Sequence, residues 1–217
     1  MKIVCMSDLH GNLIKDVPSG DTLVITGDIC PVTNHEVYYQ KKWIYNDFIP
    51  YLESLKHPNK IFIFGNHDFC GQLKQFVAKT HSDCESKGIT LLHDSEAVID
   101  GLKFYGTPFT PWFYNWAFNL YEEQLRKVYD KIPKDTNVLL THGPPKYVLD
   151  LNCAGGEHCG SACLLDIIQH DLKELKLSVF GHIHEPYGIV LGTPIYVNAS
   201  ILNDEYIVKN PPIVVEI

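Results

Sequence analysis

Five short polar blocks in this sequence carry side chains that bind metal ions or transfer protons. They are Ser7-Asp8-Leu9-His10, Gly27-Asp28, Gly65-Asn66-His67-Asp68, His142-Gly143 and Gly181-His182-Ile183-His184. In the first and last blocks the two candidate ligands are two residues apart, a spacing that turns both side chains to the same side of an extended backbone. Each block follows directly on a short apolar run. The pattern therefore indicates chemistry at the ends of several strands.

Taken one at a time, these blocks have ordinary structural explanations. Asp8 and His10 could form a polar turn that caps a helix, and dipeptides such as Gly27-Asp28 commonly mark turns. A single histidine such as His142 more often makes a structural hydrogen bond than binds a metal. Five independent turns would not be expected to place only metal-competent side chains at one edge of a sheet, so we favour a shared site.

The side chains in these blocks suit divalent transition-metal ions. Two Asp, one Asn and four His form an oxygen and nitrogen set without thiolate, which suits Mn, Fe, Zn, Co or Ni better than Ca or Mg alone. Seven ligands are too many for one ion and suit two ions that share a carboxylate. Two ions about 3.5–4 Å apart can hold a hydroxide between them and stabilise both oxygens of an in-line displacement at phosphorus. The candidate ligands are Asp8, His10, Asp28, Asn66, His142, His182 and His184.

The apolar runs that precede the blocks have the length and composition of buried strands. They span Lys2–Met6, Thr22–Thr26, Lys60–Phe64, Asn137–Thr141 and Leu177–Phe180. Such runs are typical of the buried sheet of an α/β protein, in which ligands bind beyond the carboxyl ends of the strands.

Segments with helical spacing of apolar residues separate these strands. The four longest are Glu36–Lys56, Gln72–Lys87, Leu120–Lys131 and Ser161–Leu175. The alternation predicts a layered α/β fold with helices on both faces.

Shorter strand-like pieces occur outside this alternation. Ala97–Tyr105 has Asp100-Gly101 near its middle and predicts a hairpin. Near the C-terminus, Tyr187–Leu191 and Pro194–Asn198 predict a second hairpin, and Ile213–Ile217 predicts an edge strand.

Composition limits the class of protein. The chain has 217 residues, 45% of them hydrophobic and 20% charged, which predicts a globular protein with a single domain over 1–217. The apolar runs are too short for a membrane span, and the start that soon meets Asp8 argues against a signal peptide. Seven irregularly spaced cysteines favour a reducing cytoplasm. The net charge of −8 argues against an extended nucleic-acid partner but allows a small phosphoester substrate beside a local cation.

The five blocks together resemble the pattern of the calcineurin-like metallophosphoesterases. That family carries, in order, an Asp-x-His, a Gly-Asp, a Gly-Asn-His-Asp or Gly-Asn-His-Glu, a lone His and a Gly-His-x-His. All five stand here in the same order, from Asp8 to His184. The resemblance implies an α/β sandwich of two packed mixed β-sheets flanked by helices, with the metal site at the carboxyl ends of the strands.

The resemblance also implies a role for each residue. One metal would be bound by Asp8, His10 and His184. The other would be bound by Asn66, His142 and His182, with the Asp28 carboxylate bridging the two. His67 has no metal to bind in this scheme. It resembles the family's catalytic histidine, which protonates the leaving oxygen or stabilises charge on the phosphoryl group.

The sequence resembles one branch of the superfamily more than the others. Protein Ser/Thr phosphatases continue the Gly-Asp block with an Asp-Arg-Gly that this chain lacks, and nuclease members usually carry further regions. The nearest resemblance is to small metallophosphoesterase-domain proteins, through Gly106–Asn119, Leu140–Pro145, Phe180–Glu185 and Tyr196–Ser200. That branch implies hydrolysis of small phosphodiesters such as cyclic nucleotides, with manganese as the first metal to test.

Two alternatives accompany this functional hypothesis. One is a phosphomonoesterase. The other is a catalytically silent protein-binding scaffold on the same fold, which the presence of every expected ligand and of His67 disfavours.

The sequence leaves the surroundings of the site open. The aromatic run Trp112–Phe118 is explained most simply by packing, although one or two of its rings could wall the pocket and stack a base. The glycine-rich loop before Ser161 could border the substrate, because a helix N-terminus favours an anionic group. Four residues nearby could be imagined as a zinc site: Cys153, His158, Cys159 and Cys163. Their spacing matches no standard zinc site, so we interpret the cysteines as structural.

Overall fold

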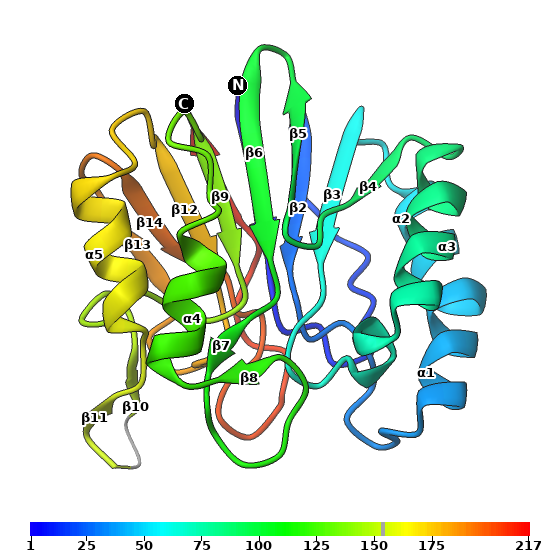
Figure 1. The fold of residues 1–217 in the computed structure, drawn as a ribbon. Coiled ribbons are helices and arrows are strands. Elements are labelled where there is room, and N and C mark those ends of the chain that lie inside the picture. The colour runs from blue at the N-terminus through cyan, green and yellow to red at the C-terminus, as the bar shows by residue number, and fades with distance from the viewer. Residues whose placement is uncertain (153–154) are drawn as a thin grey trace.

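The computed structural model describes residues 1–152 and 155–217, and two β-sheets form its centre (Figure 1). The first sheet has the strand order β15-β1-β2-β3-β4. Its strands are β1 (Lys2–Met6), β2 (Thr22–Thr26), β3 (Asn59–Ile63), β4 (Ile89–Leu91) and β15 (Ile213–Glu216). Strands β1 to β4 are parallel, and β15 pairs antiparallel with β1.

The second sheet has the order β13-β14-β12-β9-β6-β5. Its strands are β5 (Ser95–Ile99), β6 (Leu102–Thr107), β9 (Val138–Thr141), β12 (Leu177–Phe180), β13 (Gly188–Val190) and β14 (Ile195–Asn198). The four inner strands are parallel, and the edge strands β5 and β13 are antiparallel to their neighbours. Both sheets are therefore mixed.

Helices cover the outer faces of the two sheets (Figure 1). Beside the first sheet lie α1 (Val37–Trp43), the π-helical η1 (Ile44–Phe48), α2 (Ile49–Ser54), the 3₁₀ turn η2 (Phe69–Gln72) and α3 (Lys74–Glu85). Beside the second lie α4 (Glu122–Tyr129) and α5 (Ala162–His170). Within the described ranges, no helix combines the length and the apolar character needed to cross a membrane.

Two short strand pairs lie beyond the carboxyl ends of the main strands. They are β7 (Thr110–Pro111) with β8 (Asn119–Leu120), and β10 (Leu151–Asn152) with β11 (Glu157–His158). The loop between β7 and β8 lies at the bottom of Figure 1.

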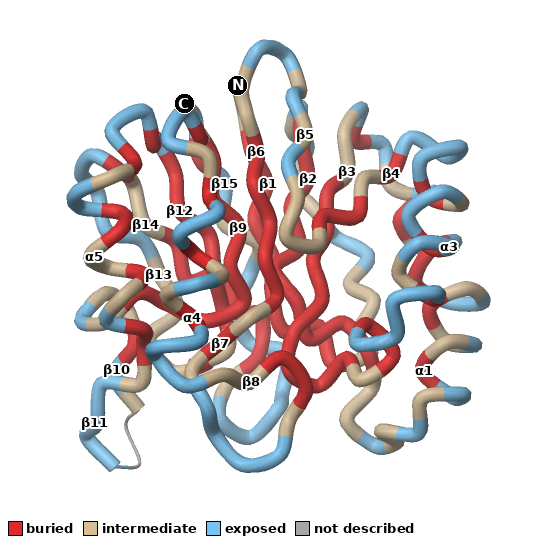
Figure 2. Tube along the Cα trace, in the orientation of Figure 1, coloured by how far each residue is buried: buried red, intermediate tan, exposed pale blue. Residues whose placement is uncertain are grey.

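Strands buried on both faces explain why the sequence shows continuous apolar runs. In β1, Ile3 and Cys5 face the layer between the two sheets, whereas Val4 and Met6 face the layer under the helices of the first sheet. Alternate side chains of a strand point to opposite faces, so a strand covered on both sides needs apolar residues at every position. Figure 2 shows these strands as the buried centre of the molecule.

The structure confirms the predicted α/β sandwich and its strands. Strands β5 and β6 pair as the predicted hairpin, with Ile99 opposite Leu102. Asp100 and Gly101 between them have φ values of 49° and 79°, and a type I′ turn requires positive φ at both positions. The C-terminal prediction also holds, because β13 and β14 form a hairpin and β15 is an edge strand.

The predicted helices differ from the structure mainly at their ends. The segment predicted as one helix over Glu36–Lys56 is a continuous run of α1, η1 and α2. Leu120 belongs to β8 rather than to α4, and α5 ends at His170 instead of Leu175. Leu175 remains buried beneath the second sheet, so its apolar character reflects tertiary packing without a helix.

The two sheets are joined at the edge where their parallel strands end. Ser7, just beyond β1, forms a parallel bridge with Ser200, just beyond β14, and Ile201 N–H donates to the Ser7 carbonyl at 3.1 Å. His142 Nδ1 lies 2.9 Å from the Thr26 carbonyl of β2. The loops that follow strands of both sheets therefore converge at this edge.

Candidate metal centre

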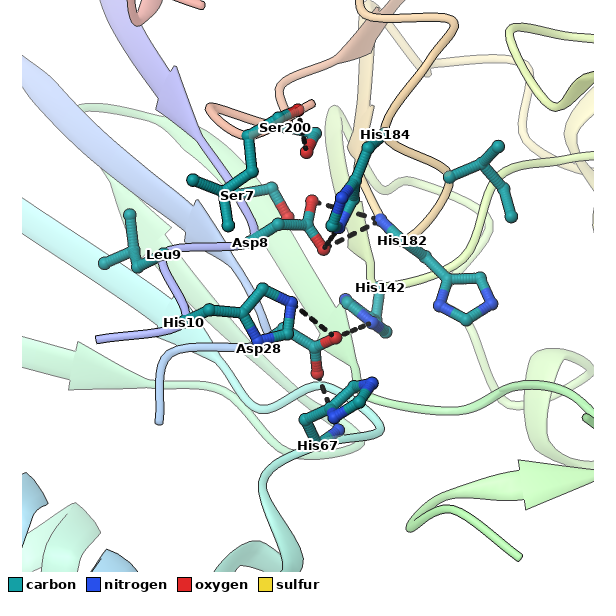
Figure 3. A network of polar contacts seen from close by, with 12 residues as sticks. Ser7, Asp8, Leu9, His10, Asp28, His67, His142, His182, His184 and Ser200 are labelled. Carbon is teal, nitrogen blue, oxygen red and sulfur yellow. Dashed lines mark hydrogen bonds and ion pairs between the residues drawn. The ribbon is translucent and has the colours of Figure 1, made fainter. Parts of the chain in front are cut away.

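The converging loops bring six of the predicted ligands into two clusters. The first, which we call group one, consists of Asp8, His10 and His184, and the second, group two, consists of Asp28, His142 and His182. Within each group the potential ligand atoms lie within 4.8 Å of one another (Figure 3). In each group the aspartate comes from the first sheet and at least one histidine comes from the second.

Asp28 and Asn66 connect the two groups. Asp28 Oδ2 lies 3.5 Å from His10 Nε2 in group one and 3.2 Å from His142 Nε2 in group two. Asn66 Oδ1 lies 2.7 Å from the same His142 nitrogen, which adds it to group two. The seven residues predicted as ligands thus lie together, with one carboxylate between the two groups.

Backbone carbonyls orient two of the histidines. His142 Nδ1 faces the Thr26 carbonyl at 2.9 Å, and His184 Nδ1 faces the Asn203 carbonyl at 2.9 Å. A carbonyl oxygen can only accept, so each Nδ1 must carry the hydrogen, and each ring presents a lone pair on Nε2 to the site once it is neutral. Hydrogen bonds of this kind fix the tautomer and the orientation of metal-binding histidines.

Unpartnered nitrogens show that the site fits a cation. Both ring nitrogens of His10 are buried and have no hydrogen-bond partner among the described residues. His142 Nε2 also points into the site, where it lies 2.7 Å from Asn66 Oδ1 and 3.2 Å from Asp28 Oδ2. Buried polar atoms without partners cost free energy, and a positive ion placed among these atoms would satisfy them. The residues present therefore fit two divalent ions.

Four of the proposed ligands lie on strained backbone. Asp8, His10, Asp28 and His182 have positive φ values of 56°, 42°, 50° and 70°. Residues other than glycine rarely adopt this region, and such strain clusters at functional sites. At Gly181 a Cβ atom would overlap Asp8 Oδ2 and the Ser7 hydroxyl, so only glycine allows this close approach.

The carboxylates are ionised although they are buried. Burial alone would raise the pKa of Asp8, but His184 Nε2, 3.6 Å from Asp8 Oδ1, outweighs burial and brings the pKa to about 2. For Asp28 burial also opposes ionisation, but the charges of His142 and His67 hold its pKa well below its usual range. Two buried negative charges therefore face the centre of the site.

The imidazoles divide into neutral and protonated ones. Burial lowers the pKa of His10 to about 4 and that of His182 to about 3, so both are neutral ligands at neutral pH. Burial also acts to lower the pKa of His142, but the Asp28 carboxylate outweighs it and raises the pKa to about 9. In the metal-free protein His142 therefore carries a proton that a bound metal must displace.

His67 lies beside the two groups and belongs to neither. Its backbone N–H donates to Asp28 Oδ1 at 2.7 Å, and its carbonyl accepts from Gln40 Nε2 at 2.7 Å. Its ring lies 4.1 Å from the Trp116 ring, measured between centroids, and its Nδ1 lies 3.1 Å from His35 Nε2. The buried surroundings lower the pKa of His67. The histidine predicted to act without a metal is thus fixed next to the ligands.

Several positioning residues were not predicted from the sequence. The buried Asp68 carboxylate accepts from the backbone N–H groups of Ile29 at 3.2 Å, Cys30 at 2.9 Å and Gly65 at 2.8 Å. It therefore ties the loop after β2 to the loop after β3. The position of Asp68 in the Gly-Asn-His-Asp block is the sequence feature that could have identified it as part of the site. Gln40 lies on α1 and belongs to no sequence motif that could have identified it.

A cavity of about 440 Å³ opens over the two groups and His67. The aromatic side chains of Trp112, Phe113, Tyr114 and Trp116 line it, and the first three of these are exposed. The packing interpretation holds for Phe118, which is buried, whereas more rings line the cavity than the one or two that were expected. Trp112 and Trp116 do both, because Trp112 also stacks on Tyr121 and Trp116 packs against His67 and Phe69.

The loop that contains β10 and β11 also borders the cavity, through Glu157, His158 and Cys159. We predicted that this loop would lie near the substrate because the N-terminus of the following helix favours an anion. That reason is wrong, because the Glu122 carboxylate already accepts from Ala162 N–H and Cys163 N–H at the start of α5. Among residues 1–152 and 155–217, groups one and two are the places where three metal-binding side chains come together. Within these ranges no zinc site forms at Cys159 or Cys163. Cys153 lies outside the described residues.

Comparison with known proteins agrees with this architecture. A profile of the calcineurin-like phosphoesterase family matches residues 1–186. The chain is 33% identical to the human metallophosphoesterase domain-containing protein 1 over 239 residues, which cover all of this chain and 71% of the human protein. A Caenorhabditis elegans UPF0046 protein is 32% identical over all of this chain and 60% of its own length.

A solved structure shows the same fold at low sequence identity. The phosphopantetheinyl hydrolase of Mycobacterium tuberculosis superposes with a TM-score of 0.57 at 15% identity, over 92% of this chain and 89% of that one. The family match spans all five polar blocks. The chain belongs to the calcineurin-like phosphoesterase family, whose members bind metal ions, and is a hydrolase that acts on phosphoester bonds.

Proposed function

We propose that this protein hydrolyses small phosphodiesters, such as cyclic nucleotides, at a pair of divalent metal ions. The observation that carries the proposal is the arrangement of two ligand groups around one shared carboxylate, Asp28. A single carboxylate between two groups suits two neighbouring ions, and paired ions are typical of phosphoester hydrolysis. A silent scaffold would have no need to keep this arrangement, nor the strained backbone that builds it.

Group one would hold the first ion, and group two with Asn66 would hold the second. Asp28 would contribute an oxygen to both. The two ions, when bound, supply an activated water at neutral pH and neutralise negative charge on the phosphoryl oxygens. Manganese is our first expectation for both positions, and the mixed nitrogen and oxygen set would also accept Fe, Zn, Co or Ni.

His67 would protonate the leaving oxygen. Its backbone is fixed by the bond from its N–H to Asp28 and by Gln40 at its carbonyl, and Trp116 packs against the ring. A fixed imidazole beside the reacting group can deliver a proton without reorganising first. The leaving group of an alkyl phosphodiester is a poor alkoxide, so this proton matters most for such substrates.

Metal reconstitution with a substrate panel tests the proposal. Metal-stripped protein is loaded with Mn, and bound metal is measured per chain. We expect about two ions per chain, turnover of adenosine 3′,5′-cyclic phosphate, and slower turnover of p-nitrophenyl phosphate. Binding of two ions without turnover of any diester would contradict the proposed substrate class, and faster turnover of the monoester would favour a phosphomonoesterase. The cytoplasmic location and the small-molecule partner stay predictions.

A further inference from the structure

The cavity over the candidate metal centre has an exposed aromatic wall. Trp112, Phe113 and Tyr114 lie in the loop between β7 and β8, and their exposed fractions are 50%, 55% and 66%. The base of this loop is fixed, because Thr110 N–H donates to the Phe118 carbonyl at 3.2 Å and Ala117 N–H donates to the Asn66 carbonyl at 2.9 Å. The rings are therefore held beside the cavity while at least half of each remains in water, although Trp112 also stacks on Tyr121, with 5.5 Å between the ring centroids.

Large aromatic side chains gathered at the mouth of a cavity indicate a binding surface. Their exposure costs free energy that a planar ligand would recover by covering them. The wall continues into the site, because Trp116 lines the same cavity and lies 4.1 Å from the His67 ring. Since His67 is the proposed proton donor to the leaving oxygen, the wall lies on the side of the leaving group.

The charge of the cavity adds a second constraint. Among the described residues that line it, none is Lys or Arg, whereas Glu157, Glu185 and Asp204 are acidic. The chain as a whole carries a net charge of −8. Away from the proposed metal ions, a second phosphate on the substrate would meet these carboxylates and no Lys or Arg side chain among the described lining residues.

We propose that the cavity selects phosphodiesters whose leaving group bears a planar nucleobase and no further phosphate. This inference rests on the proposed function and names the part of the substrate that the aromatic wall and the acidic rim recognise. The base would stack on the rings of the β7–β8 loop, an interaction that tolerates different bases because every base has a flat face. The acidic rim would exclude substrates that carry additional phosphates.

A matched pair of substrates isolates the contribution of the base. Adenosine 3′,5′-cyclic phosphate is compared with the same ribose cyclic phosphate carrying a methoxy group in place of adenine, so the scissile bonds are identical. For the Mn-loaded protein we expect kcat/KM to be about tenfold or more higher with the base present, as stacking on one aromatic side chain allows. In the Trp112→Ala/Phe113→Ala double variant this ratio should fall toward one.

A control variant separates stacking from general effects of removing aromatic residues. Tyr38→Ala/Tyr39→Ala removes two rings of α1, which do not line the cavity, and should keep the wild-type ratio. Equal kcat/KM for the two substrates in the wild type, or an unchanged ratio in the loop variant, would overturn the inference and leave the proposed function standing.

A substrate with a second phosphate tests the charge requirement separately. A 2′-phosphorylated adenosine cyclic phosphate should react about tenfold more slowly than its parent, and Glu157→Lys should recover part of that loss at low salt but not at high salt. Equal rates for the two substrates in the wild type would overturn this part of the inference.

A binding measurement keeps the test independent of turnover. Two of the three tryptophans, Trp112 and Trp116, line the cavity, so a stacked base should quench the intrinsic fluorescence. Quenching by the cyclic nucleotide and not by its base-free analogue, without hydrolysis of either, would support the inference and contradict the proposed function. Neither quenching nor hydrolysis would overturn both.

Discussion

Asp68 gives the sharpest test of how this site is built, because it is a positioning residue that contacts no reacting group. Replacing it by Ala removes the acceptor for three buried backbone N–H groups, those of Ile29, Cys30 and Gly65. An unpaired buried N–H costs about 1–3 kcal/mol, so the low end for three is about 3 kcal/mol. For a chain of this size each kcal/mol lowers Tm by about 2–4 °C, which gives a loss of about 6–12 °C.

Metal affinity should fall along with stability. Asp28 and Asn66 stand on the two loops that Asp68 ties together, so their oxygens would lose their fixed positions. Losing a residue that orients metal ligands typically costs about 10–100-fold in metal affinity. We therefore expect Asp68→Ala to weaken Mn binding by that factor while all seven proposed ligands are still present.

Thermal unfolding of the metal-free protein and chelator competition measure the two effects separately. Asp135→Ala is the matched control, because Asp135 forms an exposed ion pair with Lys103 at 2.8 Å and should change Tm little. If Asp68→Ala unfolded within about 2 °C of the wild type and bound Mn equally well, the two loops would be positioned by other contacts and our account of the site would be wrong.

Three further predictions concern the chemistry of the centre. Asp28→Asn should reduce bound Mn from about two ions per chain to one or none, because a neutral amide would face both ions; full occupancy measured by elemental analysis would exclude a shared ligand. His67→Ala should keep both ions but lower turnover by roughly 10²–10⁴-fold on a cyclic nucleotide. The loss should be much smaller on bis(p-nitrophenyl) phosphate, whose leaving group needs no proton, and equal losses would restrict His67 to charge stabilisation. Because the pKa of His142 is raised to about 9, Mn binding at pH 7 should release a proton and tighten as pH rises toward 9. Calorimetry in buffers of different ionisation enthalpy would show this release, and its absence would mean that His142 is neutral in the metal-free protein.

The strand ends were the predictable part of this molecule. A short apolar run followed by Asp, Asn or His is a local pattern, and parallel strands place such ends at one edge by geometry alone. The closeness of Asp8 to His184 could therefore be predicted, although they are far apart in sequence. Their roles as ligands stay predictions until metal binding is measured.

Contacts between distant elements were not predictable in the same way. Gln40 is a polar residue on a helix, and only the packing of α1 against the loop after β3 brings its amide to the His67 carbonyl. His35 reaches His67 through a loop with no motif. The same limit explains the helix ends, because Leu175 has the spacing of a helical residue but is buried by tertiary contacts beyond the end of α5. Single-sequence patterns carry little information about such contacts.

The origin of the ligands from two sheets has a consequence for the mechanics of the fold. Each proposed ion would be a cross-link between the two layers of the sandwich, placed where the Ser7–Ser200 bridge already joins them. Metal binding would then add to the free energy of unfolding, by about 2.7 kcal/mol for each ion at a free concentration of 100 Kd. Removing the ions would loosen the layers first at this edge, while the hairpin of β5 and β6 at the opposite end would keep its protection from hydrogen exchange. Loss of the ions would thus let the two sheets separate first at the edge that carries the proposed ligands.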